Sequence, residues 1–379
     1  MPPRPAGSLA AMHQDRLGRV RAAMEAQAID VCLLSVGPDL PWLIGYEAMP
    51  LERLTMLVVP RHDRATLVVP QLEVPRVRHD PALFALRGWG ETEDPVALVA
   101  GLVGSASSAA IGDRTWAQFL VELQHRLPEV SFGRASAVLG PLRAVKEPSE
   151  LEVLRAAAAA VDRIAGELQS GEIPLIGRTE AEVSAELGRR ILAAGHHRVN
   201  FAIVAAGENA ASPHHEPGGR VIGPGEVVLC DFGGTMLSAE GAGYCSDITR
   251  CVVTGEPTSE MLEVYAVLHE AQRAAVAAGT VGATCASVDA AARSIIGSAG
   301  FGEWFMHRTG HGIGVEEHED PYIVAGNTHR LEPGNVYSVE PGIYLPGRFG
   351  FRLEDIVATT IDGPDALNQA DHALVVVDA

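Results

Sequence analysis

The sequence predicts two domains, a smaller N-terminal α/β domain followed by a larger α+β domain. At 379 residues, the chain exceeds the common size of a single domain. Strand-like and helical segments alternate in its first part, as in α/β domains, whereas short apolar strands broken by Gly and Pro dominate beyond Asn200. The stretch Leu139–Pro148 between them carries two prolines and one glycine. We therefore expect domains at residues 1–140 and 149–379, joined by a linker at 141–148.

The elements of the N-terminal domain follow from the spacing of apolar residues. Leu17, Val20 and Met24 fall on one face of a helix that we expect over Asp15–Gln27. Apolar runs bounded by turn residues predict the strands. The elements expected after this helix are strands Val31–Ser35, Leu54–Pro60 and Ala65–Pro70, a helix Pro95–Val103, a strand from Ala109 and a helix Trp116–Arg126.

Helix-start signals mark the beginning of the second domain. Proline and an acidic residue favour a first helical turn, so Pro148-Ser149-Glu150 opens an alanine-rich helix expected over Glu150–Leu168. Thr179, followed three residues later by Glu182, is a capping-box pattern for a helix over Thr179–Ala194. Further helices are expected over Ser259–Ala278 and Ser287–Ala299, among short strands.

The chain is strongly acidic. Its 48 Asp and Glu residues outnumber 29 Lys and Arg residues, which gives a formal net charge of −19. Such a chain repels nucleic-acid phosphates and anionic membrane surfaces, so neither is expected as a partner. Bound divalent cations would neutralise part of the excess. Lys146 is the only lysine, which leaves arginines as the candidates to bind a substrate carboxylate.

The cysteines and the N-terminal sequence favour a reducing compartment. Five cysteines, an odd number without a C-x-x-C pair, argue against a disulfide framework and against a zinc knuckle. We expect them to be small, buried apolar residues. The N-terminus has no apolar run long enough for a signal peptide, and apolar residues nowhere run on far enough to span a membrane. We therefore expect a cytoplasmic protein.

Two aspartates stand beside apolar strands in the second domain. The apolar run Val227–Cys230 ends on Asp231, and Tyr244–Thr249 reads as a returning strand that contains Asp247. If these strands pair as a hairpin, both carboxylates project from the same face. Neighbouring half-buried carboxylates raise each other's pKa, and a divalent cation removes that cost. Taken alone, the pattern also fits two solvated strand acids.

A histidine-rich segment and two glutamates complete the candidate set. Residues 307–321, HRTGHGIGVEEHEDP, hold three histidines and four acids in a glycine-rich stretch that is not expected to be helical. Glu340 and Glu354 each end a short apolar run and are separated by a Pro- and Gly-rich turn, so a second hairpin would bring them together. Together with Asp231, Asp247 and His311, these two glutamates form a ligand set rich in oxygen atoms. Such a set suits Mn²⁺ or Co²⁺, whereas a structural zinc site is typically rich in thiolates.

These residues carry a resemblance to a known family. The order Asp231, Asp247, His311, Glu340, Glu354 is similar to the dinuclear-metal signature of the pita-bread metallopeptidases, which include Xaa-Pro dipeptidase (prolidase), aminopeptidase P and methionine aminopeptidase. Further matching blocks are PHHEP at 213–217, DFGG at 231–234, SDITR at 246–250, SVEPGIY at 338–344 and RLED at 352–355. The resemblance implies a pita-bread α+β fold for the second domain. The first domain resembles the creatinase/prolidase N-terminal domain.

Within this family, two members fit poorly. A separate N-terminal domain argues against methionine aminopeptidase, and the intact ligand set argues against creatinase, the metal-free relative. The resemblance then implies a hydrolase with two divalent ions, manganese in preference to cobalt or zinc. Asp231 would bind one ion, His311 and Glu340 the other, and Asp247 and Glu354 both. A water bridging the ions would lose a proton and attack the peptide carbonyl as hydroxide.

The resemblance also implies roles for residues around the ions. Glu340 would take and return the proton during the reaction. His214 would hydrogen-bond the scissile region, and His318 would stabilise the oxyanion or orient the residue after the cut. Arg352 resembles the family arginine that orders the ligand shell. We expect His215 to point away from the site, while the alternatives for His307 are an ordinary histidine and one that contacts the ligands.

The substrate preference is inferred from two sequence blocks and the length of the chain. The PHHEP and HEDP blocks and the length favour an Xaa-Pro dipeptidase, with aminopeptidase P, which removes the first residue of longer Xaa-Pro peptides, as the alternative. A dipeptidase needs a cation for the free carboxylate, and the candidates are Arg220, Arg348 and Arg352. A catalytically silent pita-bread binding protein would have lost a ligand or a histidine, and none is lost. Because relatives are often homodimers, we expect a homodimer whose Asp39–Trp42 or Tyr46 closes the partner's site.

The sequence departs from the family pattern at one point. Asp231 and Asp247 are sixteen residues apart, a longer spacing than is usual. The surplus lies in Leu237–Gly243, LSAEGAG, which reads as a flexible hairpin tip. Because lengthening a loop costs little entropy, we expect the ligands still to meet. Glu240 on this tip reads as a solvated acid, with a substrate contact as the alternative.

Overall fold

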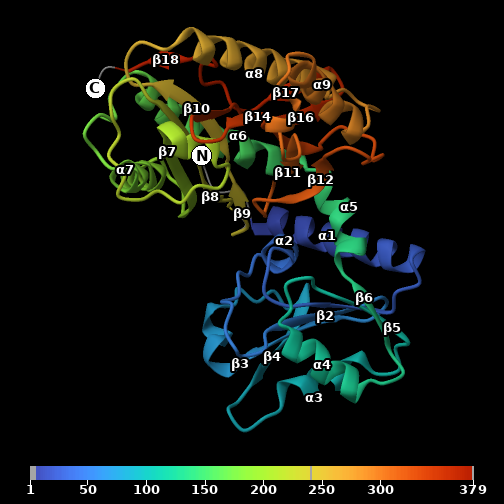
Figure 1. Ribbon diagram of the computed structural model, residues 1–379. Coiled ribbons are helices and arrows are strands. Elements are labelled where there is room, and N and C mark those ends of the chain that lie inside the picture. The colour runs from blue at the N-terminus through green and yellow to red at the C-terminus, as the bar shows by residue number, and fades with distance from the viewer. Residues whose placement is uncertain (1–5, 240, 378–379) are drawn as a thin grey trace. The chain divides into compact units, whose positions relative to one another are not determined.

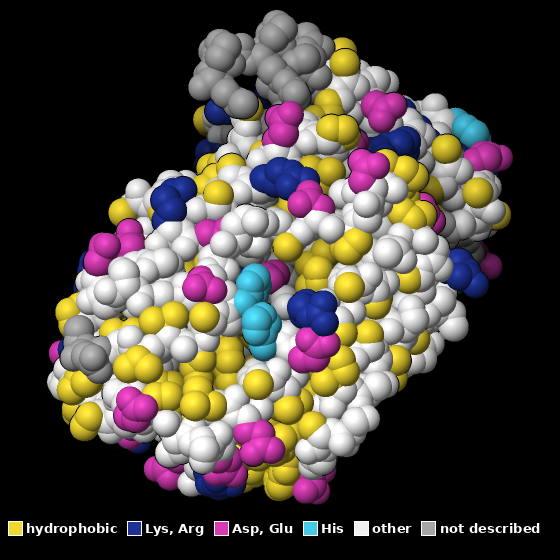
Figure 2. Space-filling model, turned by 90° about the horizontal axis from the view of Figure 1, so that it is seen from above, with side chains coloured by type: hydrophobic (Ala, Val, Ile, Leu, Met, Phe, Trp, Pro, Cys, Tyr) yellow, Lys and Arg dark blue, Asp and Glu magenta, His cyan; other side chains and the backbone are white. Residues whose placement is uncertain are grey.

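The computed structural model describes residues 6–239 and 241–377, which form two compact units. The first unit extends to Arg143 and includes Ser238–Gly243, and the second comprises the rest. Figure 1 shows the elements of both units. In the described ranges, none of the helices combines the length and the apolar character that crossing a membrane requires. On the face shown in Figure 2, acidic and basic side chains are interspersed rather than gathered into one acidic field.

The first unit is built on a mixed sheet with the strand order β4-β3-β2-β1-β5-β6. Strands β1, β5 and β6 run parallel, whereas β2 is antiparallel to both of its neighbours. Val99 and Phe119 on the helices pack with Leu33 and Val58 of the sheet in one apolar core. The strands are β1 (Val31–Leu34), β2 (Met56–Pro60), β3 (Ala65–Pro70), β4 (Phe84–Trp89), β5 (Ser108–Ile111) and β6 (Ser131–Arg134). The helices are α1 (Ala6–Ala26), α2 (Asp39–Ile44), the 3₁₀ helix η1 (Gln71–Arg76), α3 (Pro95–Val103), α4 (Ala117–Arg126) and α5 (Ser136–Ala144).

Helix α5 extends into the predicted linker. Residues 141–144 of the linker are helical, although Pro141 lies inside the helix. A proline lacks the N–H that would bond the carbonyl four residues earlier, here that of Ala137. The Gln27 side chain donates to this carbonyl at 3.1 Å instead. Helix α1 likewise begins nine residues before the expected Asp15, because the alanine-rich stretch ahead of it is a good helix former.

The second unit contains two sheets, each covered by a pair of helices. Helices α6 (Pro148–Gln169) and α7 (Glu180–Ala193) pack their apolar faces on the sheet β18-β10-β8-β7. Helices α8 (Ser259–Ala278) and α9 (Cys285–Ser298) pack on the sheet β12-β11-β13-β16-β17. The strands of the first sheet are β7 (Arg198–Ala206), β8 (Val227–Leu237), β10 (Ile248–Val253) and β18 (Val375–Val376), with β9 (Gly243–Cys245) paired to β8. Those of the second are β11 (Gly310–Gly312), β12 (Glu319–Ile323), β13 (Val336–Val339), β16 (Asp355–Thr360) and β17 (Gly363–Ala366).

Short elements complete the second unit. Strands β14 (Gly342–Leu345) and β15 (Phe349–Arg352) form a ribbon of their own. The 3₁₀ helices are η2 (Gly207–Ala211) and η3 (Gly302–Trp304). Helix α7 begins with the predicted capping box, in which Glu182 N donates to Thr179 Oγ1 and Thr179 N donates to the Glu182 carboxylate. Each of the five cysteines is free and buried, as expected.

The strand predicted over Tyr244–Thr249 is interrupted. Strand β9 ends at Cys245 and β10 begins at Ile248, so Asp247 lies between strands rather than inside one. At this point β8 carries Gly233, where a Cβ atom would collide with the carbonyl oxygen of Ser246. The Ser246 hydroxyl contacts His196 Nε2 at 2.8 Å and accepts from Gly234 N at 3.1 Å. These contacts hold the break in place.

Candidate metal centre

Strands β8 and β10 bring the two aspartates to one face. The strands are antiparallel, and Asp231 is opposite Thr249. Asp247 comes two residues before Thr249, and side chains two apart in an extended chain point to the same side. Asp231 and Asp247 are both buried, at 8% and 4% exposure. The pairing expected from the sequence is therefore confirmed, although the returning strand begins one residue after Asp247.

The two glutamates meet in the same way in the second sheet. Glu340 follows β13 and Glu354 precedes β16, and these strands are antiparallel with Val339 opposite Asp355. The chain between them forms the β14–β15 ribbon, in which Gly342 is opposite Arg352. The hairpin predicted from the Pro- and Gly-rich turn is confirmed.

His311 lies in β11, beside β13. Gly310 allows this close approach, because a Cβ atom there would collide with the Ser338 carbonyl oxygen. His311 N donates to Ser338 Oγ at 3.0 Å, and His311 Nδ1 lies 3.1 Å from the Gly312 carbonyl oxygen. Since a carbonyl oxygen only accepts, Nδ1 carries a proton, and Nε2 is directed at the acids.

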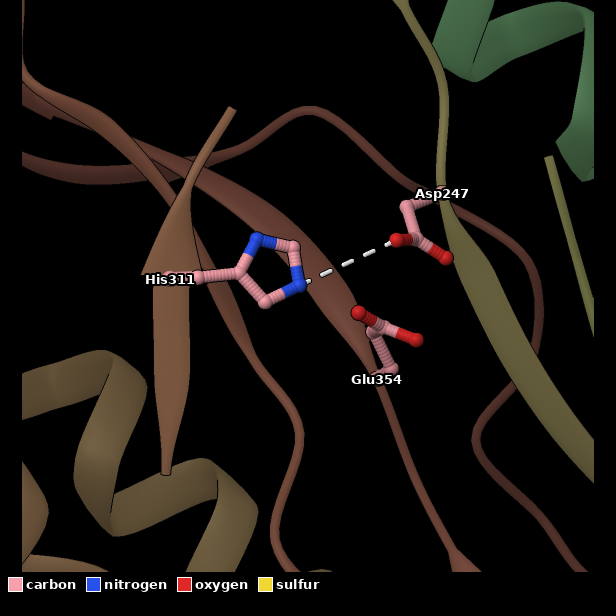
Figure 3. A group of neighbouring side chains, drawn as sticks. All are labelled: Asp247, His311 and Glu354. Atoms are coloured by element: carbon pink, nitrogen blue, oxygen red, sulfur yellow. Dashed lines mark ion pairs between the residues drawn. The ribbon is translucent and has the colours of Figure 1, made fainter. Parts of the chain in front are cut away.

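The side chains of Asp247, His311 and Glu354 point toward one another (Figure 3). Each offers a ligand atom, and these atoms all lie within 4.8 Å of one another. His311 Nε2 is 4.0 Å from Asp247 Oδ2 and 3.2 Å from Glu340 Oε1. Asp231 lines the same pocket. The structure thus brings the sequence-predicted ligand set to one place.

The pocket has a volume of about 530 Å³, within the usual range for small-molecule sites. One part of its wall is apolar, formed by Phe201, Ile203 and Pro213, and the rest is polar. The polar lining consists of Asp231, Asp247, His311, Glu340 and Glu354, with His214, His307, Arg308, Glu317, His318 and Arg352 around them.

Burial and mutual repulsion shift the acids' pKa values. Burial raises the pKa of Asp247 well above its ordinary value, and the charges of Glu354 and Asp231 raise it further. Burial also raises the pKa of Glu354, together with the charges of Glu340 and Asp231. Glu340 differs: burial alone would raise its pKa, but the hydrogen bond from His311 and the nearby positive charges lower it to about 2.

The donor set fits divalent metal ions. Among the described residues, no hydrogen-bond donor reaches Asp231 Oδ1 or Asp247 Oδ1, although both atoms are buried. Buried carboxylate oxygens without a donor are costly unless a cation lies against them. Carboxylates with one imidazole form a set that suits Mn²⁺ or Co²⁺. The residues present could therefore hold such ions.

Arg352 connects the ligand set to the surrounding fold. Its guanidinium contacts the carboxylate of Asp231 and donates to Tyr344 Oη at 2.8 Å and to the Pro213 carbonyl at 3.2 Å. Tyr344 Oη lies 2.9 Å from His307 Nε2, so His307 is linked to Asp231 through two intermediate side chains. Sequence analysis did not single out Tyr344, whose only sequence signal is its place in the SVEPGIY block.

His214 and His318 both line the pocket, and His214 lies in a turn. Burial, followed by the charges of His311 and Arg308, lowers the pKa of His318 to about 4. Arg308 Nη2 is 3.2 Å from His318 Nδ1, and its guanidinium stacks over Tyr322 at 4.5 Å from the ring centroid. Sequence analysis did not single out Arg308, although it lies in the histidine-rich segment.

The other arginines proposed for a substrate carboxylate are engaged elsewhere. Arg220 donates to both oxygens of Glu226, at 2.9 and 2.6 Å, and Arg348 pairs with Glu260. Neither lines the pocket. By contrast, no described carboxylate lies within ion-pair distance of Arg308. His215 contacts Glu180 rather than the pocket, as expected. Glu240 lies outside the described residues.

Comparison with known proteins decides the family. Residues 151–360 match the model of metallopeptidase family M24, and residues 16–145 match the creatinase/prolidase N-terminal domain. The chain belongs to metallopeptidase family M24. This metallopeptidase is 42% identical over 372 residues to the probable dipeptidase PepE of Mycobacterium tuberculosis, a match that covers 97% of each chain.

Solved structures extend this comparison to the whole fold. The crystal structure of dipeptidase PepE from Mycobacterium ulcerans is similar with a TM-score of 0.91 and 41% identity, over 97% of this chain and 98% of that one. A prolidase from Thermococcus sibiricus is similar with a TM-score of 0.90 and 33% identity, over 96% and 99%. The expected fold, a creatinase/prolidase-like N-terminal domain before a pita-bread metallopeptidase domain, is confirmed.

Proposed function

We propose that this metallopeptidase is a dipeptidase that uses two divalent ions, preferably manganese, to cleave Xaa-Pro dipeptides. The observation that carries the proposal is the convergence of Asp247, His311 and Glu354 within 4.8 Å of one another, in a pocket also lined by Asp231 and Glu340. The relatives named as a dipeptidase and a prolidase support the substrate class.

The five candidate ligands divide between the two ions. We assign Asp231 to one ion, His311 and Glu340 to the other, and Asp247 and Glu354 to both. When bound, the ions would lower the pKa of a water molecule and polarise the substrate carbonyl. We assign to Glu340 the role of taking and returning the released proton, because its carboxylate lines the pocket beside the other candidate ligands.

Two histidines at the pocket complete the polar groups that reach a bound peptide. His318 has a pKa of about 4, so its imidazole is neutral at pH 7 and donates a hydrogen bond through one ring nitrogen. We assign it to the oxyanion or to the residue after the cut. His214, on the turn beside Pro213, is assigned to the scissile region.

Arg308 is the residue that we assign to the free carboxylate of a dipeptide. It lines the pocket, and none of the described carboxylates forms an ion pair with it, although Glu317 lines the same pocket. Its contacts with His318 and Tyr322 fix the direction of its guanidinium. A carboxylate bound there would form a charge-assisted hydrogen bond, whereas a longer peptide would present an uncharged carbonyl.

The deciding experiment compares Leu-Pro with Leu-Pro-Ala on Mn²⁺-loaded protein, following the leucine released from each. Release from the dipeptide alone supports a dipeptidase. Comparable or faster release from the tripeptide would instead identify an aminopeptidase P. An absence of release from both would overturn the proposed function, provided that calorimetry shows Mn²⁺ bound.

Variants test the role of Arg308. R308A should raise KM for Leu-Pro by about 10- to 100-fold, the cost of losing a hydrogen bond between charged groups. R348A is the matched control, because Arg348 is an exposed arginine paired with Glu260 outside the pocket. An R308A variant with unchanged KM would exclude the carboxylate assignment.

The location and the assembly also remain proposals. We propose a cytoplasmic homodimer, on the composition of the chain and its resemblance to homodimeric relatives. Light scattering coupled to size-exclusion chromatography would test the dimer, because a mass near 40 kDa would identify a monomer.

A further inference from the structure

A buried carboxylate behind the pocket connects several segments of the second unit. Glu180, the first residue of α7, is 0% exposed. Its Oε1 accepts from Ala206 N at 2.8 Å and from Asn209 Nδ2 at 2.9 Å. Its Oε2 contacts His215 Nε2 at 2.8 Å and Gly218 N at 3.4 Å. Since the carboxylate accepts, His215 Nε2 carries the proton that it donates.

These bonds hold the segment that carries His214. Ala206 ends β7 and Asn209 lies in η2, just before this segment, whereas His215 and Gly218 belong to the segment itself. On the other side, Arg352 donates to the Pro213 carbonyl. His214 is therefore flanked by two anchored neighbours, one connected to the metal ligands and one connected to α7.

His214 itself depends on this anchoring. It is exposed, in a turn that is closed by a hydrogen bond from His215 N to the Ser212 carbonyl at 3.2 Å. An exposed ring has little packing to fix its direction, so the backbone of the turn must set it. His215, by contrast, is 19% exposed and paired with a side chain of Glu180 that is 1% exposed.

We propose that Glu180 and His215 are positioning residues, which hold the turn at 213–214 so that His214 faces the pocket. The inference rests on the proposed function for its activity test, but not for its structural test. It explains why two adjacent histidines have different surroundings: the first reaches the pocket, and the second fixes the turn.

The activity test is a double-mutant cycle. In the presence of His214, H215A should lower kcat/KM for Leu-Pro by about 10- to 100-fold, as expected when a reacting group is misplaced. In an H214A background, the same substitution should cost less than about 2-fold, because nothing remains to be positioned. H215Q should recover much of the activity, since its amide N–H can replace the Nε2 donor. Equal losses in both backgrounds would overturn the proposal.

A second test needs no activity. In histidine-labelled, metal-free protein, the NMR signal of the His214 ring is assigned by its loss in H214A. The chemical shift of this His214 signal should change in H215A and in E180Q. E182Q is the matched control, because Glu182 lies on the same first turn of α7 but is exposed and bonds only the cap of the helix. Amide exchange over residues 206–218 should rise in H215A but not in E182Q.

The two tests separate the two proposals. If the wild-type protein cleaves no peptide while H215A shifts the His214 signal, the proposed function fails and the positioning role stands. If H215A leaves both the signal and the exchange unchanged, the positioning role fails, whatever the protein hydrolyses. Calorimetry should show unchanged Mn²⁺ affinity in H215A, because neither residue is a proposed ligand.

Discussion

Tyr344 is a residue whose hydroxyl group connects Arg352, and through it the proposed metal ligand Asp231, to His307. It contacts Arg352 at 2.8 Å and His307 at 2.9 Å, and Arg352 in turn contacts Asp231. Y344F should lower Mn²⁺ affinity by about 10- to 100-fold, the usual cost of removing a group that positions a ligand. Y337F is the control, because Tyr337 is as buried but bonds Gly279 and Thr359. Calorimetric Mn²⁺ titrations of both variants check this, and equal affinities would refute it.

The single lysine forms a buried ion pair next to His318. Lys146 Nζ lies 2.6 Å from Glu319 Oε1, and these side chains are 1% and 6% exposed. K146M should lower the free energy of unfolding by about 3–5 kcal/mol, because it removes the cation that faces a buried carboxylate. In the double variant K146M/E319Q, the free energy of unfolding should fall by less. R155M, which removes an exposed ion pair with Asp365, should lose under about 1 kcal/mol. Urea unfolding measures each, and an equal loss in K146M and R155M would contradict the argument.

At the scale of residues, sequence chemistry points to candidate ligands more readily than to the residues that contact them. Acids and an imidazole at strand ends are recognisable because few structural roles require them there. The Lys146–Glu319 pair is different, since its members are 173 residues apart in the chain and ordinary in type. Arg308 and Tyr344 are similar cases. Only the fold reveals that they meet functional side chains.

At the scale of elements, the break between β9 and β10 positions Asp247 at the pocket. Gly233 permits this break because it has no Cβ atom. G233A should lower the free energy of unfolding by about 1–3 kcal/mol or more, because the added methyl group collides with the Ser246 carbonyl oxygen. It should also weaken Mn²⁺ binding by displacing Asp247. G297A is the control: it lies in α9 with no atom near its added methyl group, and should gain about 0.5–1 kcal/mol. Thermal unfolding of G233A and G297A measures the change in Tm of each variant, and similar changes in both would refute the steric argument.

Elements with strong local signals were predictable and those that depend on distant contacts were not. The bounds of α3 and β3 match the prediction to the residue, because Pro95 follows the Asp94 cap and turn residues flank the strand. Helix α5 was missed because the Gln27 side chain, far away in the sequence, bonds the carbonyl that Pro141 leaves free. The break at Asp247 was missed because Ser246 contacts His196 and β8, rather than its own neighbours.

For the whole molecule, the net charge of −19 and the proposed metal centre are connected. Part of this charge is concentrated in the pocket, where Asp231, Asp247, Glu340 and Glu354 lie together. Without cations, their repulsion opposes folding, and bound ions relieve it. Metal binding should therefore stabilise the protein and release protons, since the raised pKa values of Asp247 and Glu354 mean that they must lose protons to bind.

The pH dependence of metal-free protein tests this connection. A carboxyl whose pKa is higher in the folded than in the unfolded chain makes the folded state bind more protons, so stability falls as pH rises above the ordinary acid pKa of about 4. In chelator-treated protein, D247N should therefore unfold at higher urea concentration than wild type at pH 7.5, and this advantage should shrink toward pH 5. Buried histidines such as His318 change stability with pH in the opposite direction. Because both proteins contain them, their contribution cancels when the stability of wild type is subtracted from that of D247N. With saturating Mn²⁺ the order should reverse, because D247N lacks a ligand. An advantage of D247N that stays constant with pH would show that Asp247 does not titrate in this range, and the account of repulsion in the pocket would then be wrong.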